Sequence, residues 1–337
     1  MNVLVAMSGG VDSSVAAALL LDAGHDVTGC TMRLWGGESD TGCCSVADVD
    51  DARRVAQQLG IPHYVFDFGD EFHTGVVEPY VAAHAAGRTP NPCIECNRTV
   101  KFDRLLRRAD ALGFDAVATG HHARVVQEDG RWRLRRAVDA AKDQSYVLHM
   151  LDQSTLARTL LPVGFLTKTV VRARAGGLGL RTATKPDSQD VCFITKGGRE
   201  RFLSTRVSFT PGRVVDGGGR EVGAVEAVEL VTIGQRKGLG LAGGADPRYV
   251  VAVEGDTVVV GSLDELRVDE VRLAAITWVD APISGEVLVQ CSAHGVPVAG
   301  TIEDGVVRFA RPTRKVAPGQ SVVLYRGDDV RGGGIAR

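Results

Sequence analysis

The stretch Ala6-Met7-Ser8-Gly9-Gly10-Val11-Asp12-Ser13-Ser14 constrains the fold of this chain more than any other. It follows a short apolar run, Val3 to Met7, typical of a buried parallel strand, and it leads into an Ala- and Leu-rich segment, Ser13 to Ala23, that predicts a helix. Adjacent glycines allow a tight turn that brings backbone N–H groups to an anion, and the helix dipole favours negative charge there. No Lys follows the glycines, so the loop matches neither GxxxxGK[ST] nor GxGxxG. We interpret it as a phosphate-binding loop rather than an ordinary glycine turn.

Strand-like and helix-like segments alternate through the first half of the chain. Further strands are predicted at 26–32, 64–66 and 116–119. Ser45 can cap a helix that ends at Gly60, and the segment from Arg98 to Leu112 is amphipathic. This alternation predicts an α/β fold with a doubly wound parallel sheet.

After about residue 195 the chain becomes rich in Gly and Val, and short strand-like runs replace the helical pattern. The predicted strands are 213–215, 228–233, 249–254, 257–260, 287–291, 296–302, 306–309 and 321–325. We expect a parallel-sheet domain over residues 1–195, a small β-rich domain over 196–266 and a C-terminal β-barrel over 267–337.

Composition excludes several classes of protein. The 337 residues carry 39 Lys and Arg against 41 Asp and Glu, a net charge of −2, so the chain is not a uniformly basic nucleic-acid binder, although a local basic face is possible. Seven cysteines are too sparse for a disulfide scaffold. The N-terminus resembles no signal peptide, and the apolar run Val15 to Leu21 is too short to cross a bilayer. We expect a cytoplasmic protein with reduced cysteines and no membrane partner.

A Cys-x-x-Cys pair, Cys93 and Cys96, stands in a stiff loop with two prolines ahead of the amphipathic segment. We predict Cys96 at or near a helix N-terminus, where the dipole and nearby Arg98 and Lys101 favour the thiolate. Half of a zinc site and a structural or redox pair remain alternatives. A further thiol, Cys192, is predicted to lie in a polar loop.

Six strings occur in one order that resembles the bacterial tRNA-specific 2-thiouridylases, members of the ATP pyrophosphatase (PP-loop) superfamily. They are Ser8–Ser14, Asn91–Asn97, Thr119–His122, Lys142–Tyr146, Asp187–Phe193 and Thr232–Gly238. The resemblance continues to Pro318-Gly319-Gln320 and is therefore essentially full length.

The resemblance implies roles for named positions. ATP binding is expected at Ala6, Met7, Ser8, Gly9, Gly10, Val11, Asp12, Ser13, Met32 and Gly120. Cys96 matches the family nucleophile, Cys192 matches the cysteine that carries a persulfide, and Asp12 is expected to meet Mg²⁺ or the α-phosphate. Contacts with tRNA are expected at Asn91, Pro92, Cys93, His121, Lys142, Asp143, Gln144 and Gln320.

The implied reaction is the ATP-dependent 2-thiolation of the wobble uridine in tRNA anticodons. ATP adenylates the C2 oxygen and releases pyrophosphate, and the persulfide on Cys192 supplies sulfur. Cys96 attacks either the adenylated base or the persulfide, and a Cys96–Cys192 disulfide remains to be reduced. The implied partners are tRNA, bound through its anticodon loop, and a sulfur donor such as a cysteine desulfurase or relay protein.

Two departures from the family pattern qualify this expectation. Part of the family has aspartate where this chain has Cys93, so Cys93, Cys96 and Cys192 could instead hold an iron–sulfur cluster that activates sulfide. Gln290-Cys291 replaces a basic-aromatic pair, so no tRNA contact is carried over to that place. The remaining thiols match no motif and are expected to be buried or incidental: Cys30, Cys43, Cys44 and Cys291.

Two arginine-rich runs suggest contacts with RNA phosphates. Residues 97–108 hold five basic residues against one acid, and residues 121–136 hold five Arg against two acids. A solvated charged face is the alternative for both. Other functions also remain open: an ATP pyrophosphatase acting on a small molecule, a non-catalytic nucleotide-binding regulator, and a zinc or redox module.

Overall fold

The computed structural model describes residues 1–34, 45–187, 191–194, 198–241 and 246–337. Within these ranges no helix combines the length and the apolar character needed to cross a membrane.

The first domain is built on a five-stranded parallel sheet. Its strand order is β3-β2-β1-β4-β7, and every neighbouring pair is parallel. The strands are β1 (Asn2–Ala6), β2 (Asp26–Arg33), β3 (His63–Asp67), β4 (Ala116–Ala118) and β7 (Thr159–Leu160). The predicted doubly wound sheet is confirmed, since the order turns both ways from β1 and places the end of β1 where such sheets bind ligands.

Helices cover both faces of this sheet. One face packs Val3, Val5 and Met7 against α1 (Val11–Asp22), α2 (Val46–Leu59) and α8 (Lys168–Gly177). The other face carries a continuous helical segment made of α5 (Pro92–Cys96), a π-helical stretch over 97–104 and α6 (Leu105–Ala111). The same face also carries α3 (Gly69–Phe72), α4 (Glu78–Ala85) and α9 (Gly198–Ser204). Both sheet faces are therefore apolar, which explains the unbroken apolar runs of the strands.

The second helix shows how directly local sequence can set an element. The hydroxyl of Ser45 accepts from the backbone N–H of Asp48, and the Asp48 carboxylate accepts in turn from the N–H of Ser45. At the other end Gly60 takes a left-handed φ of 70° as the cap. The predicted start and stop of this helix are both confirmed.

A small four-stranded sheet forms the middle of the chain, in the order β10-β11-β8-β9. Its strands are β8 (Gly212–Asp216), β9 (Glu221–Val225), β10 (Tyr249–Glu254) and β11 (Thr257–Gly261). The strand predicted at 228–233 is wrong, because Val228–Leu230 forms a 3₁₀ turn in which Val231 N–H donates to the carbonyl of Val228 at 3.0 Å. Val228 and Val231 are both buried, so the apolar pattern came from packing of a turn.

The C-terminal domain is a closed antiparallel barrel. The strands follow the order β12-β15-β14-β13-β16-β17, and pairing of β12 with β17 closes the ring. They are β12 (Arg267–Trp278), β13 (Gly285–Gln290), β14 (Val298–Glu303), β15 (Val306–Arg314), β16 (Ser321–Arg326) and β17 (Asp329–Ala336). A hairpin of the first domain, β5 (Ala123–Glu128) and β6 (Arg131–Arg136), joins this sheet through the pairing of Arg135 with Asp329. The predicted barrel is confirmed.

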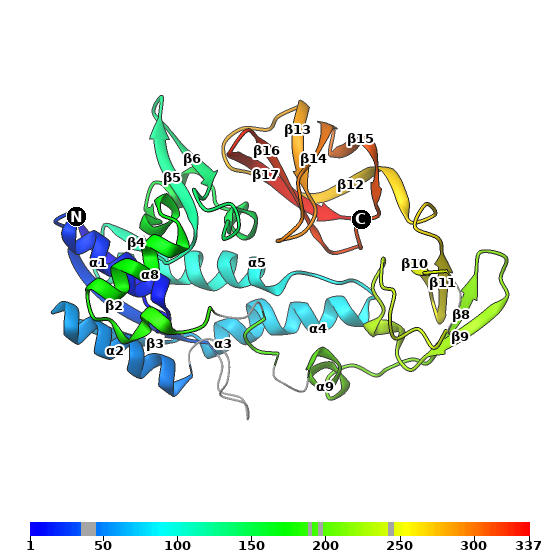
Figure 1. Cartoon of the computed structure of the whole chain (residues 1–337), viewed down its shortest axis with the longest axis horizontal. Coiled ribbons are helices and arrows are strands. Elements are labelled where there is room, and N and C mark those ends of the chain that lie inside the picture. The colour runs from blue at the N-terminus through cyan, green and yellow to red at the C-terminus, as the bar shows by residue number, and fades with distance from the viewer. Residues whose placement is uncertain (35–44, 188–190, 195–197, 242–245) are drawn as a thin grey trace.

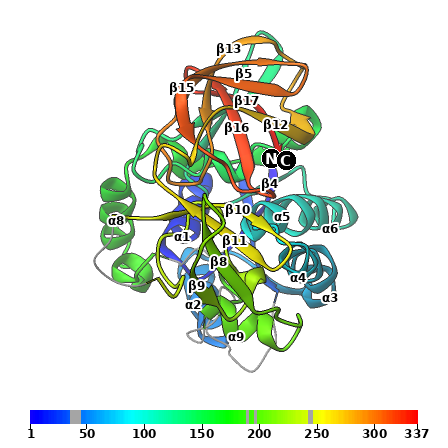
Figure 2. The same ribbon diagram turned by 90° about the vertical axis from the view of Figure 1, so that its right-hand side faces the viewer.

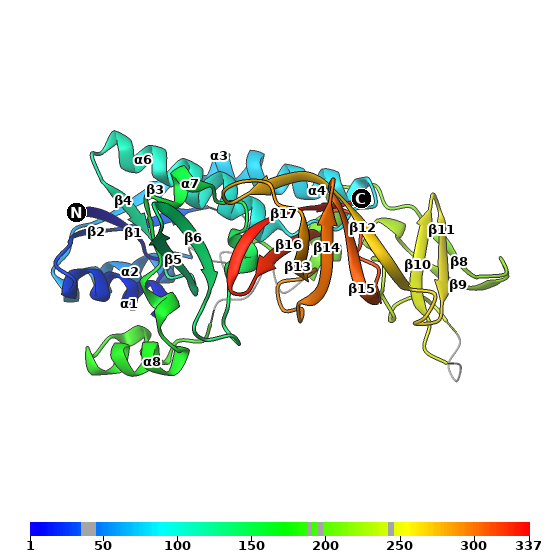
Figure 3. The same cartoon turned by 90° about the horizontal axis from the view of Figure 1, so that it is seen from above.

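The order of the domains along the chain differs from their order in space. Figures 1 and 3 place the red and orange barrel between the blue parallel-sheet domain and the yellow-green central sheet. Figure 2 shows the barrel above the central sheet and beside α5. One apolar cluster joins Ile94 and Phe102 of the first domain to Val323 and Tyr325 of the barrel, so the barrel packs directly on the helix that carries the Cys-x-x-Cys pair.

Candidate active site

The glycine loop makes a tight turn between β1 and α1. Ser13 Oγ accepts from the backbone N–H of Ser8 at 3.1 Å, and Ser14 Oγ donates to the carbonyl of Gly10 at 2.7 Å. Gly10 is the N-cap of α1, so no side chain of the cap residue covers the first N–H groups of the helix. This geometry fits an anion at the start of α1.

At two positions, backbone atoms around this loop come so close together that only glycine fits. Gly9 has φ +69°, and a Cβ on it would lie 2.3 Å from the carbonyl oxygen of Asp48. A Cβ on Gly120, after β4, would lie 2.5 Å from the backbone nitrogen of Ser13. Gly120 therefore contacts the start of α1, and Met32 lies buried near the end of β2. Their contact with a nucleotide stays a prediction.

Asp12, on the first turn of α1, is held by two cationic or hydrogen-bonding partners. Lys168 Nζ lies 2.6 and 2.8 Å from its two oxygens, and His122 Nε2 lies 3.0 Å from Oδ1. Burial alone would raise the pKa of Asp12, but the hydrogen bonds from His122 and Lys168 outweigh it and hold that pKa below its usual value. Asp12 is thus an anion fixed at the mouth of the loop.

Lysines distant in sequence supply the positive charge that the glycine loop itself lacks. Lys168 also lies 2.9 Å from Asp187, and that carboxylate meets Lys142 at 2.8 Å and Arg172 at 2.7 Å. Burial alone would raise the pKa of Asp187, yet the bonds from Lys142 and Lys168 hold it far below its usual range. Neither Lys168 nor Arg172 was predicted from the sequence, because neither residue stands in a motif.

A second ion-pair group supports the other side of the loop. Lys185 Nζ donates to the carbonyl of Gly9 at 2.9 Å and pairs with Asp48 at 2.7 Å and Asp51 at 2.8 Å. Lys185 stands two residues before Asp187, so one short segment provides charges to both groups. In the sequence, the only indication of this role of Lys185 was its place in the same polar run as Asp187.

The structure corrects the predicted setting of Cys96 and Cys192. The helix begins at Pro92 with Asn91 as its cap, accepting from the N–H of Cys93 at 3.0 Å. Cys93 therefore lies in the first turn, whereas Cys96 is the fifth helical residue, where the effect of the dipole has declined. Cys96 is 6% exposed and belongs to the apolar cluster of the sheet, and Cys192 packs against that same cluster rather than lying in a wholly polar loop.

Aromatic contacts hold the chain next to Cys192. The ring of Phe193 is 2% exposed and makes edge contacts with Phe72, Tyr80 and Phe202 at centroid distances of 5.6, 5.5 and 5.1 Å. Such contacts stabilise beyond the area they bury. Packing of Phe193 thus brings Cys192 and Cys96, distant in sequence, to one cluster.

The positions expected to contact tRNA are mostly engaged within the chain. His121 is buried beside Thr119, 2.7 Å from its hydroxyl, and burial together with the charge of Lys101 lowers its pKa to about 3, so it is neutral. Asp143 pairs with Arg136 at 2.9 Å, and Gln144 accepts from the N–H of His122 at 2.8 Å. Gln320 donates to the carbonyl of Thr89 and so ties the barrel to the loop before Asn91. Whether these residues also meet tRNA stays a prediction.

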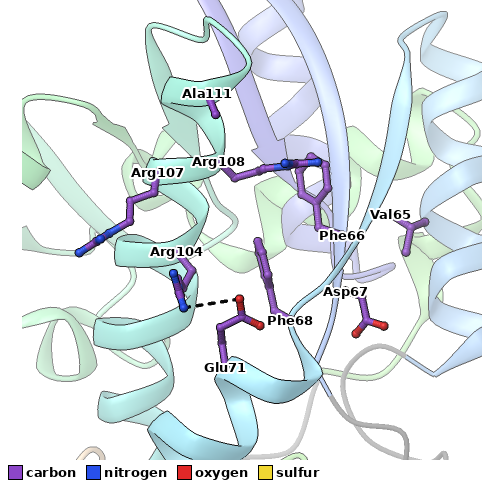
Figure 4. Close-up of a pocket in the computed structure, with 9 residues that line it drawn as sticks. All are labelled: Val65, Phe66, Asp67, Phe68, Glu71, Arg104, Arg107, Arg108 and Ala111. Atoms are coloured by element: carbon purple, nitrogen blue, oxygen red, sulfur yellow. Dashed lines mark ion pairs between the residues drawn. The ribbon is translucent and has the colours of Figure 1, made fainter.

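The first arginine run lines an open cavity of about 470 Å³ at the edge of the sheet (Figure 4). Arg104, Arg107 and Arg108 project from the helix, Phe66 and Phe68 from the end of β3. The guanidinium of Arg108 stacks 5.1 Å from the ring of Phe66. The ion pairs of Arg104 and Arg107 are at the surface, with the arginines 46% and 70% exposed.

Two of the four remaining cysteines, Cys30 and Cys291, lie among the described residues. Burial raises the pKa of Cys30 well above its usual value and that of Cys291 to about 11. Cys43 and Cys44 lie outside the described residues, as do Ser188 to Asp190 of the Cys192 motif. Among the residues that are described, Cys93, Cys96 and Cys192 included, no three His, Cys, Asp or Glu side chains are grouped so as to hold a metal ion.

Comparisons with known proteins cover the whole chain. A family model described as a tRNA methyl transferase HUP domain matches residues 1–196, and models described as a tRNA methyl transferase PRC-barrel domain and an aminomethyltransferase β-barrel domain match 200–262 and 268–336. A protein named tRNA-specific 2-thiouridylase MnmA from Chloroflexus aurantiacus is 49% identical over 100% of this chain and 98% of its own length. Proteins of the same name from Mycobacteroides abscessus and Heliobacterium modesticaldum are 48% and 47% identical, over 99% of this chain and 99% and 91% of theirs.

Proposed function

Because this chain belongs to the family of tRNA-specific 2-thiouridylases, we propose that it catalyses the ATP-dependent 2-thiolation of the wobble uridine in tRNA anticodons. One observation carries the proposal: Asp187, at the start of the Cys192 segment, shares Lys168 with Asp12 of the phosphate loop. A nucleotide site and a sulfur site are thereby linked in one network. Methyl transfer, the reaction in the name of the two models that match residues 1–196 and 200–262, does not call for a loop that binds a triphosphate.

The first step is adenylation of the uridine C2 oxygen. That oxygen attacks the α-phosphate of ATP, the bond to the β-phosphate breaks, and pyrophosphate leaves. The loop from Ala6 to Ser13, with Met32 and Gly120, is proposed to bind the nucleotide through the N–H groups at the start of α1. The carboxylate of Asp12 is proposed to contact a Mg²⁺ ion or the α-phosphate, and a Mg²⁺ ion would offset phosphate charge there.

The second step is sulfur transfer. The terminal sulfur of a persulfide on Cys192 attacks C2 and displaces AMP, and the thiolate of Cys96 then attacks Sγ of Cys192. This breaks the persulfide S–S bond, leaves sulfur on the base, and forms a Cys96–Cys192 disulfide that an external thiol must reduce. The shared apolar cluster of Cys96 and Cys192 supports this pairing. The base is reached without opening a duplex because it stands in an anticodon loop.

The packing of the proposed domains supports a separate role for each of them. Residues 1–195 would bind ATP and carry the cysteines, and the barrel over 267–337 would contact the tRNA body beside Asn91 to Cys93, where Gln320 holds the loop. Strands β8, β9, β10 and β11 form the small sheet beyond the barrel. His121, Lys142, Asp143 and Gln144 are proposed to shape the pocket for the base. A sulfur donor protein would load Cys192.

The alternative of an iron–sulfur cluster on Cys93, Cys96 and Cys192 does not fit the described geometry, since these thiols are not grouped as metal ligands. We therefore propose no step through a cluster. Anaerobic purification followed by iron and sulfide analysis tests this choice. Stoichiometric iron that tracks with activity would favour the cluster over the persulfide.

The principal test is thiolation of anticodon uridine by Cys96→Ser and Cys192→Ser, measured by nucleoside mass spectrometry with ATP, Mg²⁺ and a persulfide donor. We expect both variants to lose thiolation by at least about 10³-fold, as for loss of a catalytic nucleophile, yet to retain tRNA-dependent pyrophosphate release. Cys291→Ser is the matched control and should keep full activity. Thiolation by a Cys96→Ser, Cys192→Ser double variant would contradict the proposed cysteine chemistry. Pyrophosphate release by that variant on a small-molecule substrate, without thiolation of tRNA by the wild type, would favour a small-molecule ATP pyrophosphatase.

A further inference from the structure

The ammonium group of Lys185 has three N–H donors, and three oxygen atoms of this chain surround it. Lys185 Nζ lies 2.9 Å from the carbonyl oxygen of Gly9 in the glycine loop. It also lies 2.7 Å from Asp48 Oδ1 and 2.8 Å from Asp51 Oδ2, both on α2. The two carboxylates are 19% and 16% exposed, so water screens these ion pairs only in part. Lys185 thus joins the glycine loop to α2 with one acceptor for each of its donors.

Neighbouring contacts fix the backbone from which the Lys185 side chain projects. The N–H of Lys185 donates to the carbonyl of Thr182 at 3.1 Å, and the carbonyl of Lys185 accepts from Arg172 at 3.0 Å. Pro186 follows, and a residue that precedes proline favours extended backbone, which agrees with φ of −62° and ψ of 135° at Lys185. Because the start of the side chain is fixed, less conformational entropy is lost when the ammonium binds the loop.

The hydrogen bond from Lys185 sets the orientation of the peptide group between Gly9 and Gly10. This peptide bond is trans, and in a planar trans peptide the C=O and the N–H point in opposite directions. Because the carbonyl of Gly9 faces Lys185, the N–H of Gly10 points away from Lys185 and from the two carboxylates that Lys185 binds. Gly10 is the N-cap of α1, so its N–H adds to the donors that the start of this helix offers to an anion.

A peptide group between two glycines needs such a restraint. Glycine has no Cβ and reaches backbone conformations that are closed to other residues, so this peptide could turn over at little steric cost. Its carbonyl oxygen would then face a bound phosphate and repel it, and one N–H donor would be lost. Gly9 has the left-handed φ of +69° and no room for a Cβ, so a bulkier residue cannot stiffen the turn. The stiffness has to come from a contact outside the loop, and Lys185 makes that contact.

We propose that Lys185 is a positioning residue of the phosphate loop, which holds the Gly9–Gly10 peptide with its N–H toward the phosphates of the nucleotide. Lys185 acts through the loop backbone and not by contact with the phosphates, because its three donors are engaged within the chain. Asp48 and Asp51 hold the ammonium in place, so two acids beside the loop favour the binding of an anion. This inference rests on the proposed function, since it requires the phosphates of ATP at this loop.

The test measures the affinity of the full-length protein for α,β-methylene ATP with Mg²⁺ by isothermal titration calorimetry. We expect Lys185→Met, which keeps the length of the side chain without its donors, to weaken binding about 10-fold, as for loss of a charge-assisted hydrogen bond. Lys185→Arg should recover only part of the affinity, because a planar guanidinium does not direct its donors as an ammonium does. Binding of adenosine, followed by ligand-observed NMR, should be the same in Lys185→Met and the wild type, which a general loosening of the site would not allow.

A second variant tests the role of the acids. Asp51→Ala removes a negative charge near the phosphates, so charge alone predicts tighter binding of α,β-methylene ATP. The inference predicts the opposite sign, a loss of about threefold, because one carboxylate of the pair that fixes the Lys185 ammonium is gone. Tighter binding by Asp51→Ala would overturn the inference, and so would an unchanged affinity in Lys185→Met.

The matched control is Arg181→Ala, because Arg181 also pairs with Asp51, at 3.1 Å, but is 54% exposed. It removes one positive charge beside the same carboxylate and should change the affinity by less than about twofold. Equal losses in Arg181→Ala and Lys185→Met would assign the effect to local charge and overturn the inference. The titrations contain neither tRNA nor a sulfur donor, so a thiolation assay on the same wild-type protein shows separately whether the proposed function has failed. A wild type that binds no α,β-methylene ATP would overturn both.

Discussion

Two arginine-rich segments of similar composition have different roles in the structure. The hairpin β5–β6 directs its arginines at the barrel: Arg124 pairs with Asp328 at 2.9 Å, Arg131 with Asp280 at 3.4 Å and Arg135 with Asp329 at 2.5 Å. The helical segment over 97–111 instead directs Arg104, Arg107 and Arg108 around an open cavity (Figure 4). In the sequence both segments show a similar density of basic residues, so the sequence alone did not distinguish their roles.

Arg136 of the hairpin is more buried than the paired arginines of the helix, with 19% of its side chain exposed against 46% for Arg104. Arg136 of the hairpin pairs with Asp143, hydrogen-bonds Gln290 at 2.9 Å and stacks 3.6 Å from the ring of Tyr325. The guanidinium groups of these hairpin arginines bind partners in this chain, and phosphate contact by the hairpin stays a prediction. The arginines of the helix remain exposed enough for an external anion, so phosphate contact stays a prediction for that segment.

The strongest test of this contrast is Arg136→Ala. Its removal leaves the Asp143 carboxylate, 7% exposed, without its cation, and breaking such a pair costs about 3 kcal/mol of unfolding free energy. Urea unfolding followed by tryptophan fluorescence suits the measurement, since Trp132 lies in the hairpin and Trp278 in the barrel. Arg131→Ala is the control, because Arg131 is 60% exposed and its loss should cost less than about 1 kcal/mol. Equal losses in both variants would abolish the distinction.

The second-largest expected effect is a loss of stability in acid, on the side of the molecule where the hairpin meets the barrel. Burial lowers the pKa of His149 to about 4 from 6.5, and His149 lies against Gly333 of β17. Because the folded pKa is the lower one, the unfolded chain takes up the proton first as pH falls. The contribution of His149 to the free energy of unfolding is therefore fully present above about pH 6.5. It declines by about 2 to 3 kcal/mol as the pH falls to 4. His149→Gln should flatten that slope in urea titrations at several pH values, and an unchanged slope would assign the acid sensitivity to other groups.

The smallest effect concerns the helical arginines. We expect the triple variant Arg104→Ala, Arg107→Ala, Arg108→Ala to weaken tRNA binding about 10-fold at 0.15 M salt, and to reduce the slope of log affinity against log salt by about 0.7 to 0.9 for each phosphate that the segment no longer neutralises. Filter binding across a salt series measures both. Arg124→Ala, in the hairpin, should leave the slope unchanged. A reduced slope in Arg124→Ala with none in the triple variant would reverse the comparison.

Local features of this protein could be read from sequence because their hydrogen bonds are local. The capping box at Ser45, the turn at Gly9 and Gly10, and the start of α1 each depend on residues within about one helical turn. The strand at 228–233 was mistaken for the opposite reason. Val228 and Val231 are apolar because they fill the core of the central domain, and apolarity over a short run does not distinguish a strand from a turn.

The barrel contains a strand that local sequence patterns did not predict. Strand β17 went unpredicted, since Gly332, Gly333 and Gly334 suggest a loop. In the folded chain these glycines admit close neighbours: a Cβ on Gly332 would lie 2.3 Å from the carbonyl oxygen of Thr277, and one on Gly333 2.5 Å from Cδ2 of His149. Such close approaches depend on β12 and on the first domain, which no local pattern records.

Sequence by itself determined the family and the parallel-sheet domain followed by β-rich domains, and it indicated the loop and the cysteines that the proposed chemistry requires. These features depend on short motifs and periodic patterns. Only the tertiary structure decided which charges serve that loop. Lys168 stands 156 residues from Asp12 along the chain, yet the two ion-pair at 2.6 Å. Folding brought them together by packing α8 beside α1 on one face of the sheet. A side chain's partner is a property of that packing, and for this reason the lysine absent from the glycine loop could be supplied from elsewhere in the chain.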